Sequence, residues 1–366
     1  MRYHCSLTTN DQTGPTWEQF GLQHNWGRQG TKQRQESKKA KKKRMKGMTH
    51  NAKKKKKKKQ TYQEFHQLSI EGTNITMTDA EVFGDSMKKK PPNTVRIGLH
   101  NIQLMPENSR HYKSRQLIDH ISNAELDVLL MNEAGLNWKK VSADNQWVER
   151  TTDKLHGSKV ILAHNTTELA ITDTIQYEGV GIIATQELAH CIIDLGHNPT
   201  NLGRWAWIQI QGKEGHTTRI ATAYRPWESP GASTVFHQHA RGLAQQDDHR
   251  NLINALIEDL HKAINAWKAV GDHIIIGMDA NEDVWVGQFH DTFKRLGLRE
   301  AILDRHSNQS PPATQNRNTK RQPIDDIWVS RCISISAGGY LPFGDACPSD
   351  HRMLMIKIQY SIAFGQ

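Results

Sequence analysis

The stretch CPSDHRMLMIKI, residues 347–358, places an acid and a histidine directly before a run of apolar residues. The apolar residues between 353 and 358 predict a buried strand, because continuous apolar runs are typical of strands that are covered on both faces. Two titratable side chains, Asp350 and His351, therefore stand at the entrance of this strand. The ends of strands are where a sheet scaffold commonly presents reactive groups.

Similar runs recur along the chain from Asn93 onward. They predict strands at residues 95–103, 126–133, 159–165, 179–185, 204–210, 218–224, 273–279, 325–330 and 353–358. Apolar residues at helical spacing predict helices at 111–122 and at 251–271, the second closed by Gly271. Many strands with few helices favour two packed sheets flanked by helices over a single parallel sheet. We expect one α/β domain of 274 residues, 93–366.

The net charge of +10 is concentrated at the N-terminal end. Residues 1–92 hold 21 Lys plus Arg against 8 Asp plus Glu, and the remaining residues hold 27 against 30. The lysine-rich segment 37–60 repels itself and predicts a disordered basic tail over residues 1–60, followed by a linker over 61–92. Such a tail suits nuclear import or salt-sensitive binding to a phosphate backbone, and a solvated run without a role is the equal alternative.

Other bulk features exclude several classes of protein. No apolar run is long enough to span a bilayer, and the N-terminus lacks the apolar core of a signal peptide. We therefore expect an intracellular protein that makes no contact with a membrane. The four cysteines lie far apart, without the paired spacing of a zinc knuckle or a disulfide framework.

Polar side chains recur where the predicted strands end. They are Asn101, Glu133, Tyr224, Asp279, Asn281, Asp325, Asp350 and His351. Each has a purely structural alternative. Glu133 could cap the following segment instead of binding Mg²⁺, and Asp279 with Asn281 could form an Asx turn. A calcium loop starting at Asp279 is excluded, because its sixth position is Val284 instead of glycine and its twelfth is His290 instead of glutamate.

Taken in order, these residues resemble a known family. The series Asn101, Glu133, Tyr224-Arg225-Pro226, Asp279-x-Asn281, Ile324-Asp325 and Ser349-Asp350-His351 is similar to that of the endonuclease/exonuclease/phosphatase superfamily, which includes AP endonucleases and deoxyribonuclease I. Within it, the sequence most resembles the endonuclease domains of non-LTR retrotransposons. The resemblance runs from about Val95 to Ile358 and implies a four-layer sandwich of two mostly antiparallel sheets between helices.

The resemblance also implies roles for single residues. Glu133 would be the main Mg²⁺ ligand and Asp350 a second, with Mn²⁺ as a substitute ion. Asp279 would deprotonate the attacking water. His351, held by Asp325, would contact or protonate a phosphate oxygen. Asn101, Asn281 and Tyr224 would donate hydrogen bonds to the phosphate or the hydrated metal. A metal, a positioned base and a positioned imidazole are the groups that phosphodiester hydrolysis needs.

Two positions depart from the family pattern. Gln103 stands where AP endonucleases carry an acid, which predicts a single Mg²⁺, and Asp326 stands where an aromatic residue is common. A DNA substrate would require aromatic and basic side chains along the cleft. The candidates are Trp205, Arg225, Trp227, Arg317, Lys320 and Arg321.

Three functions fit the sequence. The first is a Mg²⁺-dependent endonuclease of retrotransposon type that nicks DNA, with the tail adding affinity for the DNA backbone. The second is a hydrolase of another phosphoester, such as RNA, an inositol phosphate or a phospholipid. The third is an inactive remnant that binds nucleic acid through its tail.

Overall fold

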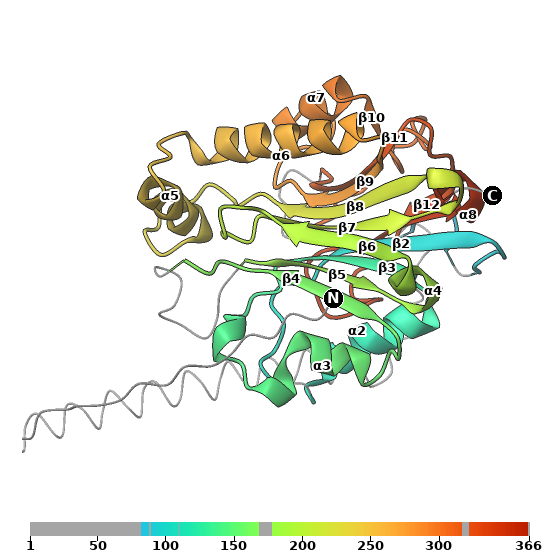
Figure 1. Cartoon of the computed structure of the whole chain (residues 1–366), viewed down its shortest axis with the longest axis horizontal. Coiled ribbons are helices and arrows are strands. Elements are labelled where there is room, and N and C mark those ends of the chain that lie inside the picture. The colour runs from blue at the N-terminus through green and yellow to red at the C-terminus, as the bar shows by residue number, and fades with distance from the viewer. Residues whose placement is uncertain (1–81, 88, 109, 168–177, 317–321, 365–366) are drawn as a thin grey trace, which may run out of the picture. The chain divides into compact units, whose positions relative to one another are not determined.

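Two β-sheets packed face to face form the centre of the protein (Figure 1). The computed structural model describes residues 82–364, apart from residues 88, 109, 168–177 and 317–321. The strands are β1 (Phe83–Gly84), β2 (Thr94–Asn101), β3 (Val128–Asn132), β4 (Lys159–Ala163), β5 (Val180–Ala184), β6 (Ile192–His197), β7 (Trp205–Gln211), β8 (Thr217–Tyr224), β9 (His273–Asp279), β10 (Leu298–Glu300), β11 (Asp325–Ser330), β12 (Ile335–Tyr340) and β13 (Leu354–Gln359). The helices are α2 (Tyr112–Asn123), α3 (Trp147–Thr152), α4 (Gln186–His190), α5 (Val235–Gln245), α6 (Leu252–Ala269), α7 (Gln288–Arg295) and α8 (Tyr360–Phe364).

Each sheet has its own order of strands. The strands of the first sheet run β1-β12-β13-β2-β3-β5-β4, and those of the second run β10-β11-β9-β8-β7-β6. Neighbouring strands are antiparallel except for the parallel pairs β2/β3 and β8/β9. Helices α2 and α3 lie outside the first sheet, and α6 and α7 lie outside the second (Figure 1). The expected pair of mostly antiparallel sheets flanked by helices is confirmed.

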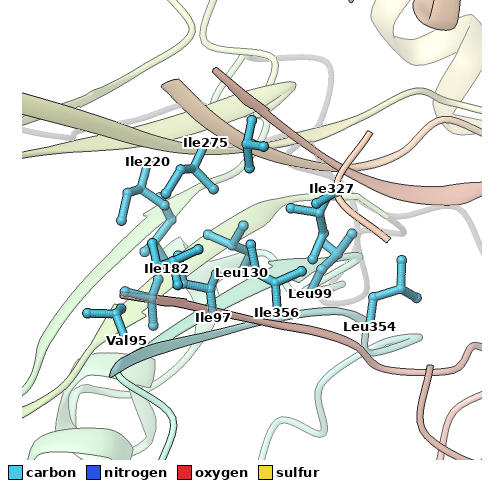
Figure 2. Packing of buried hydrophobic residues seen from close by; sticks show 14 of the residues in the cluster. Val95, Ile97, Leu99, Leu130, Ile182, Ile220, Ile275, Ile327, Leu354 and Ile356 are labelled. Carbon is cyan, nitrogen blue, oxygen red and sulfur yellow. The ribbon is translucent and has the colours of Figure 1, made fainter. Parts of the chain in front are cut away.

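The central strands are buried on both faces. In β3, Leu130 points into the space between the sheets, whereas Leu129 and Met131 pack on the side of α2. The layer between the sheets is aliphatic, and Figure 2 shows Leu99, Leu130, Ile275 and Ile327 meeting there. Since alternate residues of a strand face opposite sides, both cores require apolar residues, which explains the continuous runs in the sequence.

The strand and helix predictions locate the main elements. Each of the nine predicted strands and both predicted helices has a counterpart in the structure. Helix α6 begins where predicted, because the Asn251 side chain accepts hydrogen bonds from the backbone N–H groups of Ile253 and Asn254. It ends before Gly271, whose φ of +92° lies in the left-handed region that glycine adopts freely.

Within the described residues, four strands were not predicted, namely β1, β6, β10 and β12. Strand β12 contains Gly338 and Gly339, which remove the apolar pattern. A Cβ at Gly339 would lie 2.7 Å from the backbone oxygen of Phe83, so glycine there permits β1 to pair with β12. The C-terminal end of the predicted 61–92 linker is therefore part of the folded unit: Phe83 is buried and its strand is paired.

In the described part of the chain, no helix has the length and apolar character needed to cross a membrane.

Candidate active site

The polar residues predicted at strand ends gather at one edge of the two sheets. Tyr224 and Asp279 are neighbours at the ends of the parallel strands β8 and β9. Asp325, the first residue of the antiparallel strand β11, lies opposite Asp279. In the other sheet, Asn101 and Asn132 are neighbours at the ends of β2 and β3. Because parallel strands end at the same edge and antiparallel strands begin there, residues far apart in sequence come together.

Glu133 follows β3 directly and adopts a left-handed backbone with φ of 51°. Its Oε1 accepts a hydrogen bond of 2.9 Å from the Tyr224 hydroxyl. Burial raises the pKa of Glu133, and the charge of Asp350 raises it further. Burial and the Glu133 charge also raise the pKa of Tyr224 well above its usual value, so Tyr224 remains a neutral donor. Asp350 itself is 7% exposed.

Asp279 is fully buried and held from two sides. The Asn101 amide donates to its Oδ2 over 2.7 Å, and the Asn281 backbone N–H donates to its Oδ1 over 3.0 Å. The second bond is the Asx turn considered from the sequence, and it leaves the other carboxylate oxygen of Asp279 bonded to Asn101. Burial, followed by the charge of Asp325, raises the pKa of Asp279 well above its usual value. The Asn281 side chain donates to the Arg225 carbonyl over 2.7 Å.

His351 is 2% exposed, and its Nδ1–H donates to Asp325 Oδ2 over 2.8 Å. Burial alone would lower the pKa of this imidazole. The charge and hydrogen bond of Asp325, with the charges of Asp279 and Asp350, outweigh burial and raise the pKa to about 10. His351 is therefore an imidazolium at neutral pH, with its Nδ1 already engaged.

Asp326 points away from His351, because adjacent strand residues face opposite sides of a sheet. Its Oδ2 accepts a hydrogen bond from Trp328 Nε1 over 2.7 Å. Asp325 thus contacts His351 even though an acid stands at the following position, where an aromatic residue is common in the family that the sequence resembles.

A cavity of about 860 Å³ opens at this edge of the sheets. Its lining includes Glu133, Tyr224, Arg225, Trp227 and Asn281. Trp227 is 62% exposed, so its ring is available to a ligand at the rim. The Arg225 guanidinium donates to the Asn281 carbonyl over 3.1 Å.

Three of the proposed cleft residues, Arg317, Lys320 and Arg321, lie outside the described residues. The candidate Trp205 is wrong: it is 3% exposed and packs among the apolar residues beneath α6. Its ring fills the core, where large apolar area is best buried.

Two residues that shape the site, Asn132 and Ser349, were given no role from the sequence. Asn132 donates from its amide to Thr222 and to the Ala223 carbonyl in the opposite sheet. Ser349 donates to the Asn101 carbonyl over 2.6 Å and accepts from the His351 backbone N–H over 3.1 Å. In the sequence, Asn132 precedes Glu133 and Ser349 precedes Asp350, but only the neighbouring strands show what each contacts.

Two sets of residues could hold a cation. Among the described residues, Asp279, Asp325 and His351 offer ligand atoms within 4.8 Å of one another. An imidazolium has no free lone pair for a metal, however, and the His351 Nδ1–H is committed to Asp325. Glu133 and Asp350 fit a divalent cation better. Each is a carboxylate, the ligand that Mg²⁺ prefers, and the charge of Asp350, which raises the pKa of Glu133, would be offset by a bound cation.

No protein-family model matches the sequence, and no curated protein matches it at a significant level. Among solved structures, the chain is similar to the AP endonuclease LMAP from Leishmania major, with a TM-score of 0.54 and 11% identity over 78% of this chain and 96% of that one. It is also similar to the human Nocturnin catalytic domain, with a TM-score of 0.50 and 15% identity over 74% of this chain and 96% of that one.

The endonuclease domain of TRAS1, a telomere-specific non-LTR retrotransposon, aligns with a TM-score of 0.40 and 14% identity over 72% of this chain and 98% of that one. That likeness is too weak to bear on function. The chain has the fold of the AP endonuclease and of the Nocturnin catalytic domain, as the order of its motifs predicted, and the similarity to these structures is one of fold.

Proposed function

We propose that this protein is a divalent-metal-dependent phosphodiesterase, and specifically an endonuclease of retrotransposon type that nicks DNA. The observation that carries the proposal is the Asp325–His351 pair beside the buried carboxylate of Asp279, with Glu133 and Tyr224 at the adjoining cavity. This arrangement combines a general base, a general acid and a site for a cation. The order of the motifs supports the choice of a nuclease within this class.

Asp279 is the base in this proposal. Its raised pKa makes this carboxylate a stronger base than an exposed aspartate. Asn101 and the Asn281 backbone fix both oxygens, so the carboxylate is oriented before a water molecule arrives. The water gives its proton to Asp279 as its oxygen bonds to phosphorus.

His351 is the acid. With Nδ1–H bound to Asp325, the imidazolium retains Nε2–H for the phosphate. This proton goes to the bridging oxygen as the phosphorus–oxygen bond breaks, or it forms a hydrogen bond to a non-bridging oxygen. Tyr224 stays protonated and donates a hydrogen bond at the cavity wall. Each such acid–base group contributes about 10² to 10⁴-fold to the rate.

Glu133 and Asp350 would hold Mg²⁺, or Mn²⁺ in its place. When bound, the cation supplies positive charge to the phosphate and so lowers the cost of negative charge that builds up during the reaction. Arg225 and Trp227 would contact the substrate, the arginine through charge and the tryptophan through stacking. Arg317 would add a further phosphate contact.

The N-terminal segment completes the proposal. The basic tail, residues 1–60, would supply affinity for the DNA backbone that residues 93–366, with 27 basic against 30 acidic residues, lack. The tail lies outside the described residues, and its role in nuclear import is likewise a proposal.

A supercoiled-plasmid nicking assay tests the proposed function. The full chain is incubated with Mg²⁺, with EDTA, and as the variants His351→Ala and Asp279→Asn. His261→Ala, on the outer helix α6, is the matched control. Nicking that requires Mg²⁺, His351 and Asp279 but survives His261→Ala is the expected result.

If the plasmid stays intact although the protein is folded and binds DNA, the proposed nicking activity is wrong. Hydrolysis of bis-p-nitrophenyl phosphate in the same samples would then point to another phosphoester. Its absence would point to an inactive remnant.

A further inference from the structure

A buried histidine of β2 contacts both ends of segment 347–351, which carries the proposed acid. His100 is 1% exposed and directly precedes Asn101, the last residue of β2. Its Nε2 lies 3.3 Å from the backbone carbonyl oxygen of His351. Its Nδ1 lies 3.8 Å from the Sγ atom of Cys347. One imidazole therefore connects the first residue of this segment with the last.

Segment 347–351 depends on such contacts for its position, because it lies between β12 and β13 and forms neither helix nor strand. On one side, the Asn316 backbone N–H donates to the Asp350 carbonyl over 2.8 Å. On the side of β2, the contacts come from His100 and from Ser349, whose hydroxyl donates to a backbone carbonyl of β2. The segment is thus held by chain on two sides.

The partners of His100 fix which ring nitrogen carries the proton. A carbonyl oxygen can only accept a hydrogen bond, so the contact with His351 requires a proton on Nε2. Burial lowers the pKa of His100 to about 3, which keeps the ring neutral at pH 7. Its Nδ1 is therefore an acceptor. Burial also raises the pKa of Cys347 to about 12, so the thiol keeps its proton and can donate it to Nδ1.

We propose that His100 is a positioning residue for the reaction: its Nε2–H holds the main chain of His351, so that the His351 imidazole stays aligned between Asp325 and the phosphate. The inference rests on the proposed function, because it takes His351 as the acid. The His351 ring is fixed at Nδ1 by Asp325, over 2.8 Å, and its main chain is fixed at the carbonyl by His100. The direction of the His351 Nε2–H is then set before the substrate binds.

Two variants of the full chain test this role through hydrolysis of bis-p-nitrophenyl phosphate with Mg²⁺. His100→Leu removes the donor and should lower kcat about 10- to 100-fold with little change in KM, since a displacement of about 1 Å at a reacting group can cost about 100-fold. His100→Gln places an amide donor near the position of Nε2–H and should restore most of kcat.

His306→Leu is the matched control. His306 Nε2 contacts a backbone carbonyl in the same way, that of Gly338 in β12, over 3.0 Å. Loss of this contact should leave kcat at its wild-type value. Thermal unfolding followed by circular dichroism shows which variants are folded.

Histidine-selective ¹⁵N NMR of the wild-type chain tests the geometry apart from activity. The signals that disappear in His100→Gln, or in His100→Leu, identify the His100 ring. They should show a proton on Nε2 and none on Nδ1. If neither variant gives folded protein for kinetics, the tautomer in wild-type protein decides.

A folded His100→Leu variant with wild-type kcat overturns the role of His100 and leaves the proposed function intact. Equal losses of kcat in His100→Leu and His100→Gln, or a proton on Nδ1 of the His100 ring, have the same meaning. Wild-type protein that hydrolyses no phosphodiester with Mg²⁺ overturns the proposed function, and the positioning role with it.

Discussion

The side-chain amide of Asn101, at the end of β2, donates to Asp279, at the end of β9 in the opposite sheet, over 2.7 Å. One hydrogen bond therefore joins the two sheets and orients the proposed base. Asn132 also joins the sheets, through Thr222 and Ala223, but has no contact of this kind with Asp279. Two buried asparagines with similar structural roles thus differ in their relation to the chemistry.

This difference predicts separable effects. Asn101→Ala and Asn132→Ala should each lower the free energy of unfolding by about 1 to 3 kcal/mol, since each leaves buried groups without a partner. Asn101→Ala should also lower kcat about 10- to 100-fold, because Asp279 loses a donor that orients it. Urea denaturation and initial rates on a small phosphodiester measure the two effects. Equal losses of kcat in both variants would contradict a specific role for Asn101.

Asp325→Asn should lower the pKa of His351 in the metal-free protein. The carboxylate charge is a main cause of the pKa of about 10, and an amide cannot supply it, so the opposing effect of burial would then dominate. NMR titration of the His351 imidazole measures the shift. Asp326→Asn is the matched control, because Asp326 contacts Trp328 instead. A His351 pKa that stays near 10 in Asp325→Asn would refute the assigned pairing.

The buried carboxyl group of Glu300 should make the stability of the protein depend on pH. Burial raises the pKa of Glu300 from 4.5 to about 7, and the charge of Asp304 acts in the same direction. Hydrogen bonds from the backbone N–H groups of Leu303, Ile327 and Ile302 oppose this shift. The folded state therefore holds this proton more tightly than the unfolded state. The resulting stabilisation is complete below pH 4.5 and is lost as pH rises to about 7, by up to about 3 kcal/mol.

Glu300→Gln should remove this dependence. Urea denaturation at pH 5 and pH 8 compares the change in unfolding free energy between wild type and the variant. The decrease from pH 5 to pH 8 should be smaller in Glu300→Gln. An identical decrease in both proteins would show that Glu300 does not titrate in this range.

Close packing of the two sheets at Gly277 predicts a steric effect. A Cβ there would lie 2.7 Å from Leu130 Cδ1 and 3.0 Å from Leu99 Cδ1, across the space between the sheets. Gly277→Ala should therefore destabilise the protein by about 1 to 3 kcal/mol. Gly98→Ala in β2 is the control, since its nearest neighbour lies 3.4 Å away, an ordinary contact. Comparable thermal unfolding of the two variants would argue against this tight fit.

Deleting residues 1–60 should weaken DNA binding most strongly at low salt and leave hydrolysis of bis-p-nitrophenyl phosphate unchanged. The tail carries much of the positive charge, and its contacts with phosphates are screened as salt increases. Fluorescence anisotropy at several salt concentrations measures the binding. Loss of hydrolysis together with binding would show that the tail does more than tether DNA.

The strand pattern and the polar residues at the strand ends were readable from the sequence. Long apolar runs such as 273–279 predict strands covered on both faces, and the acids that follow them mark the edge where the strands end. Strands β1, β6, β10 and β12 were missed because they are short, largely exposed or rich in glycine, so tertiary pairing stabilises them more than local preference does.

The sequence by itself determined which residue types stand at the strand ends, and in what order. The tertiary structure decided which of them meet. It placed Asp325 against His351 while directing Asp326 to Trp328, and it buried Trp205 in the core. The physical reason is that strand register and the packing of two sheets are set by contacts between segments far apart in the chain, which no local pattern of residues encodes.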